Sequence, residues 1–121
     1  MNLEDYNNYC SQFPAAHKVI QWGGSHVWKV HTKVFAIAML QKENFPAVTF
    51  KTSELDFEIL KDRQGLRPAP YLASRGMKWI QHCNLPGLED EDLQYYIDKS
   101  FRLVSSGLSR KKQKELGILL T

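Results

Sequence analysis

The side chains of this sequence that could do chemistry are four histidines, two cysteines and one run of four acidic residues. A zinc site needs several such ligands at short, regular spacing, but neither a CxxC nor an HExxH pattern occurs. His26 and His31 lie five residues apart on one predicted strand, so their side chains point to opposite faces of the sheet. We therefore expect no metal site and no cofactor.

Nucleophilic catalysis has one candidate pair, Cys83 with its neighbour His82. Adjacent residues of a strand point to opposite sides of the sheet, so the imidazole cannot act as the base for this thiol. The sequence contains no GxSxG motif and no glycine-rich phosphate loop. The acidic run at 89–92 opens a predicted helix, where the helix dipole favours carboxylates. We expect a protein that is not an enzyme and has no catalytic residues.

Basic side chains accompany aromatic ones along several predicted strands, and this pattern suits binding better than catalysis. Lysine and arginine contact phosphates, and aromatic rings stack on bases. The same pattern also fits tryptophans packed in a core and lysines on a solvated face of a sheet. The residues concerned are Trp22, Trp28, Trp79, Tyr71, Lys18, Lys29 and Lys78.

The formal net charge is +3, but the charges are segregated along the chain. No acidic residue lies between Asp5 and Glu43 or between Asp62 and Glu89, although both stretches contain several lysines or arginines. The acids gather instead in two predicted helices. Such segregation predicts a positive surface of strands and loops and a negative surface of helices.

Hydrophobic periodicity predicts the elements that must position these side chains. Two β-rich segments flank Gly23 and Gly24, which is typical of a hairpin with a tight turn. In the next segment the residues of both strand faces are apolar, as in a central strand that is covered on both faces. In the segment after it, Phe50 points to one face of the strand, and Thr49 and Lys51 point to the other. Short links favour an antiparallel meander. The first half of the chain is thus expected to form a helix at 2–13 and strands at 17–22, 26–31, 33–41 and 47–52.

The second half of the sequence supplies further helices and one more strand. Ser53 is a suitable N-cap for a helix at 54–63 that would bury Leu55, Ile59 and Leu60. The resulting order, αββββαβαα, predicts an α+β fold in which helices flank an antiparallel sheet of about five strands. The expected elements after the proline-containing loop are a strand at 77–83, a long helix from 89 with an apolar stripe to Leu108, and a basic helix at 110–120 capped by Ser109.

The length of 121 residues suits one domain, at 1–121, with no linker or repeat. No apolar run approaches the ~20 residues of a membrane helix, and the first residues do not resemble a signal peptide. We therefore expect a cytoplasmic protein with no membrane partner and with Cys10 and Cys83 as reduced thiols. Trp79 is expected to anchor its strand by burying its ring against the first or the long helix.

Four segments resemble the MmcQ/YjbR-like family of small bacterial proteins, which are described as predicted DNA-binding proteins with a double-wing motif. The segments are KVFAIA, FKTSEL, RPAPYLASRGMKWIQ and DKSFRLV. The specific part of the resemblance is the spacing of Lys51, Pro68, Trp79 and Ser100. The resemblance implies a secretion-chaperone-like arrangement of helices around an antiparallel sheet, and it brings no catalytic residues with it.

The leading hypothesis is therefore a protein that binds nucleic acid, namely DNA, through a basic face of strands and loops. The alternative is a protein-interaction or chaperone-like module that does not bind nucleic acid. We expect a monomer or a weak homodimer in either case. The candidate contacts are Lys29, Lys51, Arg67, Arg75 and Lys78 in the acid-poor segments, and Arg110, Lys111, Lys112 and Lys114 in the last helix.

Overall fold

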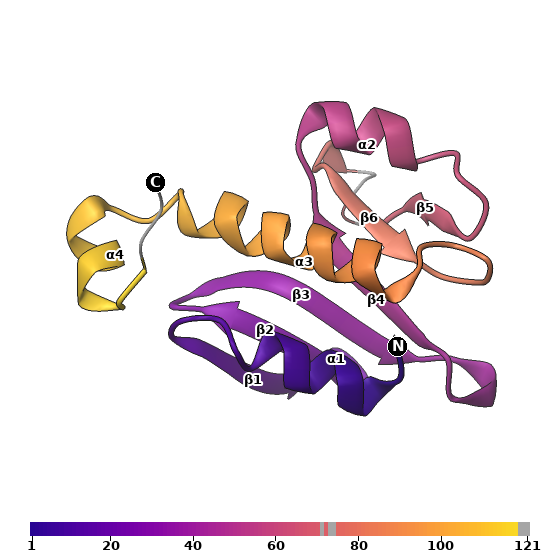
Figure 1. Ribbon diagram of the computed structural model, residues 1–121, viewed down its shortest axis with the longest axis horizontal. Helices are drawn as coiled ribbons and strands as arrows, with labels where there is room; N and C mark the ends of the chain where they lie inside the picture. The colour runs from indigo at the N-terminus through magenta and orange to yellow at the C-terminus, as the bar shows by residue number, and fades with distance from the viewer. Residues whose placement is uncertain (71, 73–74, 119–121) are drawn as a thin grey trace.

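An antiparallel sheet of six strands, in the order β1-β2-β3-β4-β6-β5, organises the computed structural model, which describes residues 1–70, 72 and 75–118 (Figure 1). Every neighbouring pair of strands is antiparallel, so the predicted α+β class and antiparallel sheet are confirmed. The strands are β1 (Ala16–Gln21), β2 (Ser25–Val30), β3 (Lys33–Leu40), β4 (Pro46–Lys51), β5 (Leu66–Pro68) and β6 (Trp79–His82). The helices are α1 (Leu3–Cys10), α2 (Glu54–Leu60), α3 (Asp90–Ser105) and α4 (Arg110–Glu115), with a 3-10 turn at Lys42–Asn44.

The first four strands form the predicted meander, and the predicted hairpin turn is confirmed. Gly23 and Gly24 have φ values of +74° and +92°, a region that glycine adopts without the steric cost of a Cβ. The sheet has one strand more than the sequence predicts. The additional strand is β5, which lies in the segment interpreted as a proline loop. It is three residues long and occupies the edge of the sheet, where Pro68 does not interrupt a central ladder.

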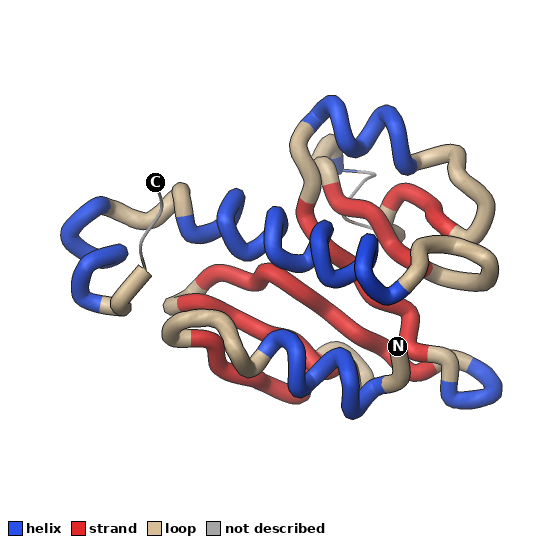
Figure 2. The backbone as a smooth tube through the Cα atoms, viewed as in Figure 1, coloured by secondary structure: helices blue, strands red, loops and turns tan. Residues whose placement is uncertain are grey.

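Helices α1 and α3 run across one face of the sheet, as Figures 1 and 2 show, and the core lies between them and the strands. Strand residues Ala36, Phe50 and Ile80 meet Tyr6 of α1 and Ile97 of α3 in this core. Both helices end earlier than expected, α1 at Cys10 and α3 at Ser105. The aromatic centre of the core is completed by Phe13, Phe35 and Phe101, with ring centroids 4.7 to 5.5 Å apart.

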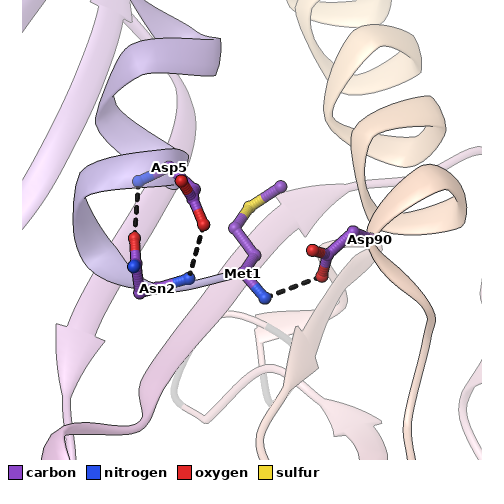
Figure 3. A network of polar contacts seen from close by, with 4 residues as sticks. All are labelled: Met1, Asn2, Asp5 and Asp90. Atoms are coloured by element: carbon purple, nitrogen blue, oxygen red, sulfur yellow. Dashed lines mark hydrogen bonds and ion pairs between the residues drawn. The ribbon is translucent and has the colours of Figure 1, made fainter.

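The start of α1 is held by polar contacts that also reach α3 (Figure 3). The Asn2 side chain accepts a hydrogen bond from the backbone N–H of Asp5, and the Asp5 carboxylate accepts one from the backbone N–H of Asn2. This reciprocal pair is a capping box, which satisfies two N–H groups that the helix cannot. The Met1 ammonium lies 2.7 Å from an Asp90 carboxylate oxygen, which joins the first turns of α1 and α3.

Ser100 fastens α3 to the middle of the sheet. The register between β2 and β3 shifts by one residue and leaves Phe35 without a partner in β2, and the β3–β4 ladder stops at Ala36 and Phe50. The buried Ser100 hydroxyl lies just beyond this last pair, between Phe35 of β3 and Lys51 of β4. It donates to the Phe35 carbonyl at 2.7 Å and accepts from the Lys51 N–H at 2.8 Å. A residue that carries the family resemblance therefore replaces a missing ladder bond.

Helix α2 differs most from its prediction. Ser53 caps it as expected, since its hydroxyl accepts from the Asp56 N–H, but the helix ends at Leu60. The predicted burial of Leu55 and Ile59 is wrong, because these side chains are 70% and 60% exposed. Phe57 and Leu60 are buried instead. This short helix offers two apolar stripes, and docking selects the stripe that reaches the core.

The ends of the chain and the cysteines complete the comparison with the expected elements. Ser109 caps α4 as predicted, but the helix ends at Glu115, and residues 119 and 120 of the predicted helix lie outside the described part of the chain. Cys10 is a buried free thiol and Cys83 a half-buried one, so the prediction of two unbridged cysteines is confirmed. In the described residues, no helix is long and apolar enough to cross a membrane.

Candidate ligand-binding groove on the open face of the sheet

The second face of the sheet is not covered by α1 or α3. Strand residues alternate between the two faces, so Ile37, Thr49 and Gln81 point away from the face on which Ala36, Phe50 and Ile80 enter the core. The prediction that β3 is covered on both faces is therefore wrong, and Met39 on its open side is 44% exposed. One row of register partners crosses this open face through all six strands, namely Val19, Val27, Ile37, Thr49, Gln81 and Arg67.

Two adjoining cavities lie along this face, and together we call them the sheet groove. The smaller one extends to the C-terminal end of α3, where Leu103 and Val104 also line it. The larger has a volume of about 550 Å³ and the smaller about 340 Å³. Trp22, Ile37 and Leu72 line both, which makes the two cavities continuous. The walls of the larger cavity are mainly apolar, with a polar group formed by Ser25, Thr49, Arg67 and Gln81.

Arg67 is held in place at the larger cavity. Its Nε donates a 2.8 Å hydrogen bond to Oε1 of Gln81, which is its partner in the β5–β6 register and is 7% exposed. The smaller cavity contributes two more cations, Lys33 and Lys51. Among the described residues that line the two cavities, none is acidic. The sheet groove is therefore positively charged and mostly apolar.

Trp22 is the aromatic side chain that the groove leaves available. It lies in the β1–β2 turn with a φ of +51°, and its side chain is 59% exposed. Trp28 is buried in the core, and its indole N–H donates to Asn7 at 2.9 Å. Trp79 is buried as predicted, but it is not part of the core beneath α1 and α3, because it points to the groove face, opposite Ile80. Trp22 is thus the tryptophan able to stack on a ligand.

Three of the predicted contact residues share the open face. Lys29 lies between Trp28 and Val30, whose side chains enter the core, so its own side chain points to the other face. Lys51 and Arg67 line the groove directly. Lys33 was missed as a contact, although the acid-free stretch of sequence between Asp5 and Glu43 contained the signal for it.

The other predicted contacts lie elsewhere. Arg75 is exposed in the loop that borders the groove, where its backbone N–H donates to the Leu72 carbonyl at 3.1 Å. Lys78 lies on the covered side of the sheet, with Nζ 4.8 Å from the ring centroid of Phe57 in α2. Figure 1 places α4 beyond the end of α3, far from β5 and β6, and this helix carries Arg110, Lys111, Lys112 and Lys114. The predicted cations therefore do not form one surface.

The histidines and cysteines do not converge on a reactive site. Cys83 Sγ donates to the Gly65 carbonyl, whereas the His82 ring stacks on Phe45 with centroids 5.7 Å apart. Burial lowers the pKa of both His82 and His26. No group of three or more metal-ligating side chains occurs in the described part of the chain.

The fold and the groove define the class: a small α+β protein whose antiparallel sheet is covered by helices on one face and open on the other. The family model described as YjbR matches residues 11–103, and the chain belongs to the YjbR family, also known as DUF419. This confirms the resemblance predicted from the sequence.

Relatives and solved structures extend over most of the chain. It is 28% identical over 119 residues to the "Uncharacterized protein YjbR" of Escherichia coli K12, covering 96% of this chain and 98% of that protein. The crystal structure of Deinococcus radiodurans protein DR2400, a DUF419 domain, has a TM-score of 0.84 at 20% identity and covers 98% of this chain and 89% of that one. A Pseudomonas syringae protein has a TM-score of 0.66 at 19% identity, covering 86% and 99%. These structures share the fold.

Proposed function

We propose that this protein binds nucleic acid, without catalysing a reaction, across the sheet groove. The observation that supports the proposal is the exposed ring of Trp22 beside a groove lined by three cations and, among its described residues, no acid. Lysine and arginine neutralise phosphates, and an exposed tryptophan provides a stacking surface for a base. The three cations are Lys33, Lys51 and Arg67.

The apolar walls of the groove favour a single strand over a duplex. In a duplex the bases stack on one another, so a protein surface meets mainly phosphates and groove edges. An unpaired base exposes its flat face, which can stack on Trp22 and lie against apolar side chains such as Ile37 and Leu72. We therefore expect tighter binding of single-stranded than of double-stranded nucleic acid.

The test is a fluorescence anisotropy titration of labelled single-stranded and duplex DNA at low and moderate salt. For a single strand, the logarithm of affinity should fall with the logarithm of salt concentration at a slope of about −0.7 per phosphate contacted. Combined alanine substitution of Lys33, Lys51 and Arg67 should weaken binding for all sequences alike, because phosphate contacts carry no direct sequence information. Absence of binding at low salt by the folded protein would contradict the proposal.

A matched control separates the groove from overall charge. Alanine substitution of Arg110, Lys111 and Lys114 in α4 removes the same number of positive charges at a distance from the groove. This variant should keep most of the affinity, and an equal loss in both variants would show that no particular face binds. Trp22→Ala should cost about 1 to 3 kcal/mol of binding free energy if one base stacks on the ring.

Exposed apolar residues on α2 support a second candidate, a protein-interaction module. Leu55 and Ile59 lie one turn apart on the same side of the helix and are 70% and 60% exposed. Glu54 and Glu58 directly precede them in the sequence. Sedimentation velocity over a range of concentrations tests for self-association through this surface. Leu55→Ser combined with Ile59→Ser should abolish any association that the native protein shows, and association that persists would place the contact elsewhere.

A further inference from the structure

We infer that the larger cavity of the sheet groove binds a small amphipathic carboxylate, an organic acid with one carboxylate and an apolar body. The inference is independent of nucleic-acid binding. It rests on the volume of the cavity, on its apolar walls and on a single oriented guanidinium, that of Arg67.

The size and lining of the cavity suit a small molecule. Its volume of about 550 Å³ lies within the range of about 300 to 1,000 Å³ typical of ligand pockets. Met39, Ala47, Ala69 and Pro70 present apolar surface to it, which suits an aliphatic chain or a flat ring. Burying this surface under an apolar ligand is favourable because it removes both from water.

The charge of the cavity indicates an anion, and its geometry indicates a carboxylate. Arg67 is the cationic residue among the described residues that line the larger cavity, and none of these residues is acidic. Gln81 accepts the hydrogen bond from Nε, which fixes the plane of the guanidinium. Among the described residues, none hydrogen-bonds the two terminal amino groups, which can therefore face a ligand. Two parallel N–H donors match the two oxygens of one carboxylate. Gln81 can do this reliably because it is itself buried in the sheet.

The single cation also limits the ligand to low charge. A dianion such as a phosphate monoester would leave one charge uncompensated against mainly apolar walls, which disfavours its burial. A neutral amphiphile would form no ion pair with the guanidinium. A monocarboxylate satisfies both the cation and the apolar walls.

The test uses isothermal titration calorimetry with octanoate, and with octanamide and butyrate as matched probes, in the absence of nucleic acid. Octanoate should bind with a stoichiometry of one. Octanamide lacks the charge and butyrate lacks the apolar length, so both should bind roughly tenfold more weakly or worse, as expected for loss of a charged hydrogen bond or of several buried methylenes. Binding of octanamide as tight as octanoate, or no octanoate binding at millimolar concentration, would overturn the inference.

Two pairs of variants locate the site. Arg67→Met keeps an unbranched side chain and should lose about tenfold or more of the octanoate affinity, whereas Arg75→Met, outside both cavities, should keep it. Met39→Glu places a like charge on the wall of the cavity, and Met39→Gln is its neutral match at an exposed position. Met39→Glu should bind octanoate several-fold more weakly than Met39→Gln. Equal affinity within either pair would place the carboxylate elsewhere.

Discussion

At the scale of the residue, Ser100 has a role that its side chain alone does not suggest. Its buried hydroxyl satisfies both the Phe35 carbonyl and the Lys51 N–H at the point where the β3–β4 ladder stops. Buried backbone groups without partners are costly, so this hydroxyl has a structural task. The presence of a serine among the residues that carry the family resemblance therefore follows from sheet geometry and requires no chemistry at the site.

Ser100→Ala should lower the free energy of unfolding by about 1 to 3 kcal/mol, because it leaves a buried donor and a buried acceptor unsatisfied. Urea denaturation monitored by circular dichroism measures this, and the slope of the transition should not change. Ser106→Ala is the matched control, since its hydroxyl bonds the Leu103 carbonyl at an exposed position. Similar stability of Ser100→Ala and Ser106→Ala would contradict the bridging role.

His82 should make stability depend on pH. Burial lowers its pKa from the ordinary value of 6.5, so the unfolded chain takes up a proton at a higher pH than the folded chain does. The contribution of His82 is therefore fully present above pH 6.5 and is lost as pH falls through the lowered pKa. Urea midpoints between about pH 7 and 5 should fall less steeply for His82→Phe than for the native protein, with a remainder from His26.

The exposed His17 supplies the control for this measurement. His17→Gln should keep the native dependence of stability on pH. The outcome that contradicts the prediction is a native protein whose urea midpoint does not change as pH falls, or a His82→Phe variant as sensitive to pH as the native protein.

At the scale of the element, α2 provides an internal comparison between its two apolar stripes. Leu60 is 1% exposed and Leu55 is 70% exposed, although both are leucines of one helix. Leu60→Ala should destabilise the protein by about 2 to 5 kcal/mol, because it removes packed methyl groups and leaves a cavity. Leu55→Ala should change stability by less than about 0.5 kcal/mol. Thermal unfolding of the two variants distinguishes them, and equal losses would mean that α2 docks through the other stripe.

At the scale of the whole molecule, the sheet separates a covered face from an open one, and the three tryptophans report on this division. Trp28 lies in the core, Trp79 is buried on the groove face and Trp22 is exposed at the turn. Trp22→Phe should therefore remove most of the tryptophan emission that acrylamide quenches in the folded protein. Quenching that remains unchanged in this variant would show that Trp28 or Trp79 is accessible to solvent.

The separation into two faces also explains why the charged side chains do not gather on a single surface. Lys99 of α3 pairs with Asp56 of α2 at 2.7 Å, which joins two helices on the covered side. Lys33, Lys51 and Arg67 line the sheet groove, and the first two share their cavity with Leu103 and Val104 of α3. A positive groove and the acidic first turns of α2 and α3 thus coexist in a chain with a net charge of +3, and α4 carries a second cluster of positive charge.

Local sequence patterns were sufficient to predict the features that depend on neighbouring residues. Alternation placed Thr49 and Lys51 opposite Phe50, the glycine pair indicated the hairpin turn, and Ser53 and Ser109 indicated two helix starts. These features depend on backbone sterics and local hydrogen bonds, which extend over a few residues. Short links between strands were also sufficient for the antiparallel meander.

Which face of each helix or strand is covered depends on contacts with distant parts of the chain, and local patterns did not predict it. Leu55 and Phe57 are equally apolar candidates for burial in the sequence, and contacts with other elements selected Phe57. The open face of β3, the edge strand β5 and the positions of Lys33, Lys51 and Arg67 along the sheet groove depend in the same way on docking. The physical reason is distance along the chain: the Ser100 hydroxyl and the Phe35 carbonyl are 65 residues apart, and no local pattern specifies that they meet.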